Sequence, residues 1–271
     1  MALQLRPSKY AYRAIVLAGL AAVRLFRVPL LASGEEHLPD DQVVHGLDRE
    51  VRPGRGAVVA VTHFGYLDFV FAQLVVWRRL RAHSRFLITR KHTGSAFVTA
   101  VCRLCDHVVV DRADGAPAYA EALAKLRRGE FLAVFPEGGV SRSWTVRPLR
   151  TGAARLAAET GAPIIPVAVW GGHRMLTRGR GRIRLRDVRG TPVRVHVGPL
   201  LRVAADEDVR AASARLRAAL QEGIDRCIDS YPVAPAPGAW WMPAHRGGGA
   251  ITVAEQAAHD ERERESYKHT G

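Results

Sequence analysis

The chain has 271 residues, 48% of them hydrophobic, which is enough to bury one sizeable core, and the composition points to a single domain with appendages. Its formal net charge of +14 at pH 7 favours an acidic partner, either a membrane surface or nucleic acid. The three cysteines argue against a disulfide framework and suggest a reducing compartment.

Residues 1–34 are predicted to form an amphipathic helix that associates with a membrane. At about 100° per residue, five basic side chains fall within an arc of about 60° and leave a wide apolar face. The uncharged run from residue 14 to residue 23 is shorter than the roughly 20 residues needed to cross a bilayer, so the helix should lie on the membrane. A signal peptide and a core-packing helix are the alternatives. The basic residues are Arg6, Lys9, Arg13, Arg24 and Arg27.

Residues 35–231 are predicted to form one domain in which strands and helices alternate. This alternation favours an α/β fold, with a mixed, largely parallel sheet flanked by helices and with functional residues at the strand ends. Strands are expected at residues 57–62, 85–89, 107–110, 130–134, 163–169, 182–187 and 192–197. Helices are expected at residues 66–82, 93–104, 116–128, 150–160 and 205–229.

Residues 232–271 begin rich in Pro and Gly and end in a charged stretch. The first part is typical of a linker, and the second part of a mobile tail or a short solvated helix. Trp240 and Trp241 could anchor this segment at a membrane interface or dock on the domain, and the sequence leaves both alternatives open.

A His-x4-Asp motif directly follows the apolar run of residues 57–61. An alcohol is a poor nucleophile at neutral pH, so a base must take its proton as it attacks a carbonyl, and histidine suits that task. His63 and Asp68 would diverge by about 140° in one continuous helix, but they can meet across a strand-to-helix turn that Gly65 loosens. Asp68 would then hold the imidazole tautomer and stabilise the imidazolium. An ordinary helix cap is the alternative interpretation of the pair.

Three further blocks follow, each an apolar run that carries or ends in polar, Gly or Pro residues: residues 108–112, 134–143 and 162–169. Together with the His/Asp block, they resemble the four ordered motifs of the glycerophospholipid acyltransferase family, whose best-known members are the 1-acylglycerol-3-phosphate acyltransferases. The resemblance spans about residues 43–200, and the order and spacing of four blocks are more specific than any one block.

The resemblance implies roles for individual residues. His63 and Asp68 match the catalytic pair of the family, with His63 deprotonating the acceptor hydroxyl. Arg112, and Glu137 with Gly138, match residues that hold the glycerol phosphate. A basic residue upstream of the second motif also contacts phosphate in the family, and spacing does not decide between Arg90 and Lys91 for that place. Pro166 falls on the Pro of the fourth motif, which shapes the acyl and acceptor pocket.

The chain departs from the family pattern in its third motif, where the arginine is displaced by two positions. Arg142 is assigned the phosphate role, because a guanidinium offers a bidentate fork to phosphate oxygens. Gly138 and Gly139 would let backbone N–H groups approach the same ligand. A strand-end ion pair at Arg112 and a plain turn at residues 135–138 are the alternatives for the single blocks.

The resemblance implies a membrane-associated acyltransferase of phospholipid synthesis. It would move a fatty acyl group from an acyl thioester, either acyl-CoA or acyl-carrier protein, to the free hydroxyl of lysophosphatidic acid, giving phosphatidic acid. No metal or other cofactor and no nucleic acid is expected, and the enzyme would sit peripherally on the cytoplasmic face of the cell membrane. One alternative is the same chemistry on glycerol 3-phosphate, another lysophospholipid or a glycolipid. Another is a non-catalytic basic protein that binds lipid or nucleic acid, although no helix-turn-helix or aromatic-plus-basic pattern supports it.

Overall fold

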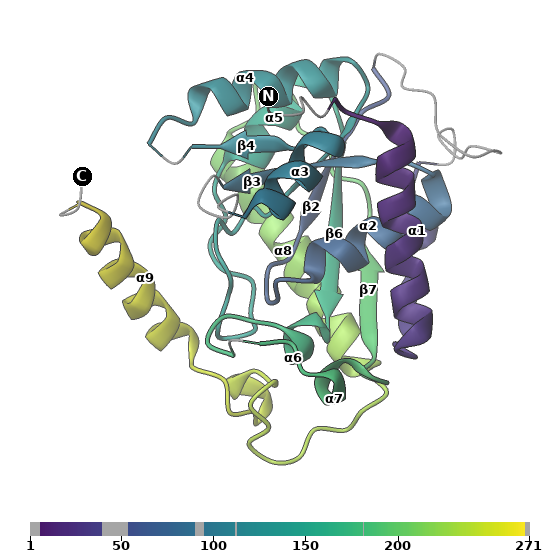
Figure 1. Ribbon diagram of the computed structural model, residues 1–271. Coiled ribbons are helices and arrows are strands. Elements are labelled where there is room, and N and C mark those ends of the chain that lie inside the picture. Colours follow the sequence, from purple (N-terminus) through teal and green to yellow (C-terminus); the bar gives the residue numbers. More distant parts are fainter. Residues whose placement is uncertain (1–5, 40–53, 90–94, 112, 181, 269–271) are drawn as a thin grey trace.

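The computed structural model describes residues 6–39, 54–89, 95–111, 113–180 and 182–268, with side chains described as far as residue 262. These residues form one seven-stranded sheet in the order β1-β7-β6-β2-β5-β3-β4, with helices on both faces (Figure 1). The strands are β1 (Leu30–Ser33), β2 (Ala57–Val61), β3 (Ser84–Thr89), β4 (Val108–Val110), β5 (Phe131–Val134), β6 (Ile164–Trp170) and β7 (Val193–Val197).

Strand β2 lies at the centre of the sheet, paired in parallel with β5 on one side and with β6 on the other. Val59 is opposite Ala133 and Ile165, which sets the three strands in register. Strand β7 runs antiparallel to β6 and parallel to β1. Because parallel strands end at the same edge of a sheet, the residues that follow β2, β5 and β6 meet there.

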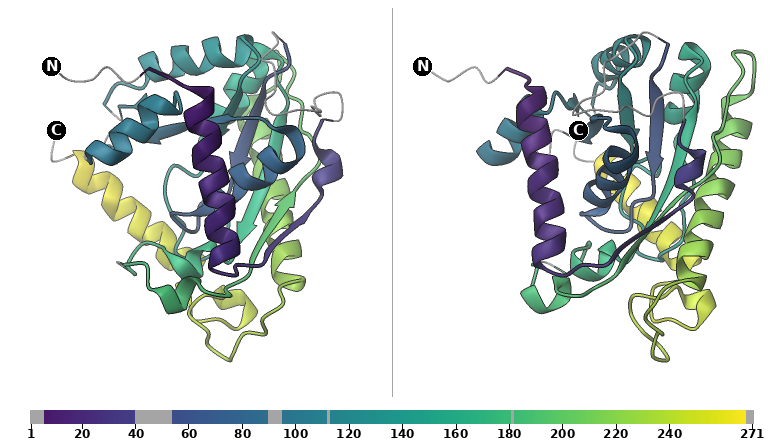
Figure 2. Two further views of the ribbon diagram at one scale, coloured as in Figure 1. Left: turned by 45° about the vertical axis from the view of Figure 1, so that its right-hand side comes forward. Right: turned by 90° about the vertical axis from the view of Figure 1, so that its right-hand side faces the viewer.

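Helices form a layer on each face of the sheet, as the right-hand view of Figure 2 shows. Helices α1 (Lys9–Leu25), α2 (Asp68–Leu80) and α3 (Ala96–Leu104) lie on one face. Helices α4 (Ala116–Arg127), α5 (Gly152–Thr160) and α8 (Val209–Asp229) lie on the other. The remaining described helices are η1 (Glu35–His37), α6 (Gly172–Met175), α7 (Leu185–Val188), η4 (Ala244–Arg246) and α9 (Val253–Lys268).

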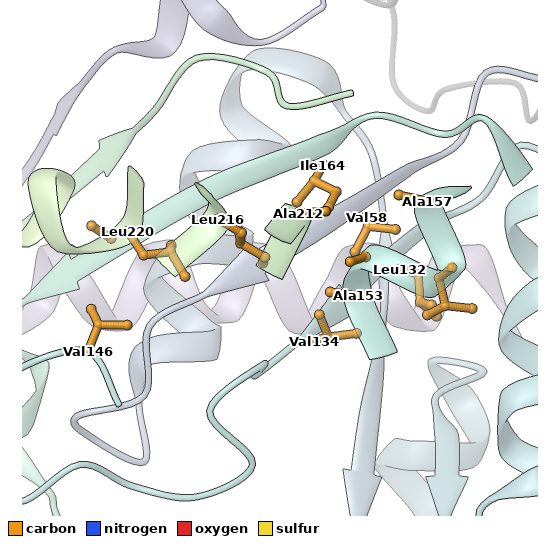
Figure 3. Packing of buried hydrophobic residues seen from close by; sticks show 14 of the residues in the cluster. Val58, Leu132, Val134, Val146, Ala153, Ala157, Ile164, Ala212, Leu216 and Leu220 are labelled. Carbon is orange, nitrogen blue, oxygen red and sulfur yellow. The ribbon is translucent and has the colours of Figure 1, made fainter. Parts of the chain in front are cut away.

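The strand side chains alternate between two hydrophobic cores, one on each face of the sheet. In β2, Val58 and Ala60 face the core under α4, α5 and α8, whereas Ala57, Val59 and Val61 face the core under α2. Figure 3 shows the first of these cores, in which strand residues pack against small and branched side chains of α5 and α8. Burying one Val or Leu side chain stabilises a fold by about 1.5–3 kcal/mol, so these cores fix where the strand ends lie.

The predicted α/β fold with a mixed, largely parallel sheet is confirmed. The strand predicted at residues 182–187 is wrong, because residues 185–188 form α7. The alternation of Arg and apolar residues there imitates a strand, but Ile183 and Leu185 are 53% and 62% exposed, and β1 already occupies the sheet edge beside β7. The short strand β1 was not predicted.

Helix α1 ends at Leu25, earlier than the predicted helical segment of residues 1–34, and the chain continues into β1. One side of α1 packs on α2: Tyr12 and Val16 are buried, and the Tyr12 hydroxyl donates to the Ser84 carbonyl oxygen at 2.6 Å. The opposite side exposes apolar side chains, with Leu25 76% exposed. Among the described residues, no helix has both the length and the apolar character required to span a bilayer.

Residues 232–250 pack on the domain, where the sequence predicted a linker. Trp241 and Met242 are buried in the same core as α8, and the Trp144 side chain donates from Nε1 to the Trp240 carbonyl oxygen at 2.9 Å. Large aromatic side chains bury much apolar area, which outweighs the tendency of neighbouring Pro and Gly residues toward an open linker. Of the two alternatives for the tryptophan pair, the structure has the docked one.

Candidate active site

His63 lies in the turn that follows β2, at the edge where the parallel strands end. Its half-buried imidazole stacks on the Phe135 ring, with 4.0 Å between ring centroids and 17° between the planes. Tyr66 meets the imidazole edge-on, with 6.4 Å between centroids. Since Phe135 directly follows β5, the imidazole is held between the segments that leave two neighbouring strands.

Asp68 is the first residue of α2 and is fully buried. Its Oδ2 accepts hydrogen bonds from the backbone N–H groups of Phe64 at 2.7 Å and Gly65 at 2.6 Å. Its Oδ1 faces Gly172 and accepts no hydrogen bond from any residue that the structure describes. Asp68 thus holds the turn that carries the imidazole through two main-chain donors, and the role expected for it in orienting the imidazole stays a prediction.

Gly65 is needed for close packing in this turn. A Cβ added to Gly65 would lie 2.8 Å from the backbone nitrogen of His173 and 2.9 Å from its Cα. A side chain at this position would therefore push the segment after β6 away from the turn. Thr177, in the same segment, donates from its hydroxyl to the Phe64 carbonyl oxygen at 2.6 Å.

Glu137 binds the backbone of the His63 turn from the other side. This buried carboxylate accepts from the His63 N–H at 2.8 Å with Oε1 and from the Arg147 N–H at 3.0 Å with Oε2. The His63 carbonyl oxygen in turn accepts from the Ser141 N–H at 2.8 Å. Both backbone groups of His63 are thus bound to the loop of residues 136–150, named here the motif loop. The phosphate-binding role expected for Glu137 stays a prediction.

Burial raises the pKa of both carboxyl groups in this site. The pKa of Asp68 lies well above its usual value, mainly through desolvation, with the nearby Glu137 carboxylate adding to the rise and two backbone N–H bonds opposing it. Desolvation raises the pKa of Glu137 to about 8, against the opposing effect of its bonds to Arg147 and His63. The neutral forms of both acids are therefore favoured beside the imidazole.

The two glycines of the motif loop leave room for arginine side chains. Gly138 has a positive φ of 68°, and a Cβ there would collide with the Arg150 guanidinium. A Cβ on Gly139 would lie 2.7 Å from Nη1 of Arg147. Neither Arg147 nor Arg150 was singled out from the sequence, since each lies nine or more residues beyond the Glu137–Gly138 pair and no spacing rule joins them.

The remaining predicted residues are placed only in part. Lys91 and Arg112, together with Arg90, lie outside the described residues. Arg142 lies in the motif loop, half-buried, and its backbone N–H donates to Oε1 of Gln256 at 2.7 Å. Pro166 lies within β6 opposite Ala60 of β2, inside the sheet.

The segment after β6 forms the third wall of the site, and sequence reasoning missed it. His173 is buried, and its Nε2 lies 3.0 Å from the Trp241 carbonyl oxygen. Desolvation lowers the pKa of His173 to about 3, so this second histidine stays neutral. The Gly171–Gly172 pair at a strand end was the signal that could have found this segment.

This arrangement can support general base catalysis. A half-exposed imidazole lies at a strand-end edge, its backbone is fixed on both sides, and an aromatic ring holds its plane. A histidine so held can accept a proton from a bound hydroxyl without a large change in the protein.

Comparisons with known proteins agree with this geometry. The family model described as Acyltransferase matches residues 33–170. A curated 1-acyl-sn-glycerol-3-phosphate acyltransferase of Borreliella burgdorferi is 28% identical over 123 residues, which make up 44% of this chain and 47% of the relative. The chain thus spans about half the length of that relative. The crystal structure of the 1-acyl-sn-glycerophosphate (LPA) acyltransferase PlsC from Thermotoga maritima shares the fold, with a TM-score of 0.61, 21% identity and 83% of each chain covered. Because the family model covers half of the sequence and includes His63, Asp68 and Glu137, the chain belongs to the Acyltransferase family.

Proposed function

We propose that this chain transfers a fatty acyl group from an acyl thioester to the free hydroxyl of lysophosphatidic acid, giving phosphatidic acid in phospholipid synthesis. The observation that carries the proposal is the half-buried His63 imidazole, held at the strand-end edge through both of its backbone groups. Family membership supports the reaction class, and the activity for which the B. burgdorferi relative is named supports the acceptor.

In the proposed mechanism His63 acts first as a base and then as an acid. The imidazole takes the proton of the acceptor hydroxyl while the oxygen attacks the carbonyl carbon of the thioester. The tetrahedral intermediate then breaks its carbon–sulfur bond, and the leaving sulfur takes the proton back from the imidazolium. One ester and one free thiol result, His63 is neutral again, and no metal is needed. Asp68 and Glu137 hold the turn that carries the imidazole.

The phosphate of the acceptor would be held by basic side chains. Arg142 belongs to that loop, and Arg112 and Lys91 are proposed from their places in the motif pattern. A guanidinium can bind two phosphate oxygens at once, which would fix the acceptor hydroxyl relative to His63. Gly138 would let backbone N–H groups approach the same phosphate.

The proposed location is the cytoplasmic face of the cell membrane, with the protein lying on the lipid surface. The side of α1 that faces away from α2 exposes apolar residues, among them Tyr10, Leu17 and Leu25. Residues 178–180 and 182–186 are exposed and rich in arginine, and the Gly190 N–H donates to the Phe26 carbonyl oxygen at 3.1 Å, beside the end of α1. Apolar side chains next to arginines suit an anionic lipid interface.

The test is acyl transfer by purified full-length protein with a panel of labelled donors and acceptors. The donors are palmitoyl-CoA and palmitoyl-acyl-carrier protein, and the acceptors are lysophosphatidic acid, glycerol 3-phosphate, lysophosphatidylcholine and a glycolipid. We expect label in phosphatidic acid at a higher kcat/KM than in any other product. Preferred transfer to another acceptor would overturn the proposed acceptor, and no transfer to any acceptor would overturn the proposed reaction.

A further inference from the structure

Helix α9 docks on the motif loop through two polar side chains. Gln256 accepts from the Arg142 N–H with Oε1 at 2.7 Å, and Asp260 pairs with the Arg147 guanidinium at 2.7 Å. Gln256 also donates from Nε2 to Oδ1 of Asp260 at 2.7 Å, so the two residues act on the loop as one unit. Figure 1 shows α9 as the yellow helix that otherwise extends away from the sheet.

These two polar contacts hold α9 on the motif loop, because α9 has no apolar face with which to pack. Among its described side chains, residues 253–262, only Gln256 is buried. The Arg147 and Asp260 side chains are 16% and 13% exposed, and both Nε and Nη2 of Arg147 contact the same carboxylate oxygen. An ion pair shielded to this degree holds its geometry better than an exposed pair.

The loop that α9 holds is the loop that holds His63. The Arg147 N–H binds Glu137, whose other oxygen binds the His63 N–H, and the Ser141 N–H binds the His63 carbonyl oxygen. Asp260 is therefore joined to the His63 backbone through Arg147 and Glu137. Gln256 holds Arg142, the residue next to Ser141, and so supports the second bond to His63.

The motif loop depends on such side-chain bonds because residues 136–150 form no helix or strand. From α8, Gln221 accepts from the Val146 N–H at 2.9 Å and Arg217 donates to the Val146 carbonyl oxygen at 3.1 Å. These bonds hold the loop at Val146. Helix α9 holds the same loop at Arg142 and Arg147.

We propose that Gln256 and Asp260 of α9 are positioning residues, which set the place of the His63 imidazole by holding the motif loop at Arg142 and Arg147. The proposal rests on the acyl transfer proposed above for its kinetic consequence. A small displacement of a catalytic group lowers the rate of the chemical step on the order of tenfold or more. Release of α9 should therefore lower kcat while the KM for the donor changes little.

The kinetic test compares single variants of the full-length chain. Asp260→Asn and Gln256→Leu should each lower kcat on the order of tenfold. Asp260→Glu keeps a carboxylate and should recover most of the rate, which a purely structural role for the helix would not require. Glu261→Gln removes an exposed carboxylate from the same helix and serves as the matched control, with wild-type kcat expected. Unchanged kcat in both Asp260→Asn and Gln256→Leu would overturn the proposal.

A second measurement does not depend on turnover. Amide hydrogen exchange of His63, Ser141 and Arg142 should be faster in Asp260→Asn and Gln256→Leu than in the wild-type protein, and unchanged in Glu261→Gln. If the wild-type protein transfers no acyl group but this exchange still rises, the proposed function fails while the coupling of α9 to His63 stands. Unchanged exchange at His63 in both variants would overturn the coupling itself.

Discussion

At the scale of single residues, two buried carboxylates of the site bind backbone N–H groups around the imidazole. Asp68 holds the N–H groups of Phe64 and Gly65, and Glu137 holds those of His63 and Arg147. The sequence predicts that His63, Asp68 and Glu137 lie at one edge of the sheet, because each follows a predicted strand. It could not show which donors lie nearest to a buried carboxylate, because that depends on the turn geometry.

The raised pKa of Glu137 predicts a pH dependence of stability. Its pKa is about 8 in the folded protein against an ordinary 4.5, so ionisation favours unfolding, and stability is lost as the pH rises from about 4.5 through about 8. Glu137→Gln cannot ionise. The unfolding free energy of this variant, relative to that of the wild type, should therefore rise over that pH range and then level off.

Urea unfolding at several pH values measures this difference. The variant also loses some unfolding free energy at every pH, because its amide presents N–H to one of the two backbone donors. The diagnostic quantity is therefore the slope of the stability difference with pH. Parallel stability curves for the two proteins between about pH 5 and about pH 8 would show that Glu137 ionises as an ordinary carboxyl group.

At the scale of elements, hydrophobic periodicity predicted the interior strands and the long helices well. It failed where an element has no buried face: residues 182–187 alternate like a strand but are exposed, and α9 docks through two polar side chains. It also missed β1, an edge strand that lies inside the segment of residues 1–34 predicted as a helix. Helix ends agree with simple capping chemistry, as at α5, which ends at Gly161 in the left-handed conformation with a φ of 68°.

The outward side of α1 predicts how the protein meets a lipid surface. Leu17 and Leu25 are 43% and 76% exposed, so Leu17→Ser with Leu25→Ser should leave thermal stability nearly unchanged. Binding to vesicles of anionic phospholipid should weaken on the order of tenfold, because the buried apolar area in the interface is lost. Co-sedimentation measures the binding, with the similarly exposed Val253→Ser on α9 as the control. Equal binding by both proteins would show that α1 does not face the lipid.

At the scale of the whole molecule, the parallel sheet assembles the site from distant parts of the chain. Strands β2, β5 and β6 end together, and the segments that leave them wrap His63. Strand order and motif order made this edge predictable. The contribution of α9 was not predictable from the sequence. Gln256 lies 114 residues beyond Arg142 and Asp260 lies 113 residues beyond Arg147, and no sequence pattern joins them. The packing of residues 232–250 likewise depends on where Trp240 and Trp241 find a surface.

The central claim is that the His63 imidazole removes the proton of the acceptor hydroxyl. The most direct test is kcat/KM for acyl transfer to lysophosphatidic acid by wild-type protein, His63→Ala and the exposed-histidine control His245→Ala, with folding checked by circular dichroism. We expect His63→Ala to lose on the order of 10³-fold in kcat/KM, a typical contribution of general base catalysis, while remaining folded, and His245→Ala to match the wild type. Turnover by folded His63→Ala at the wild-type rate would contradict the account.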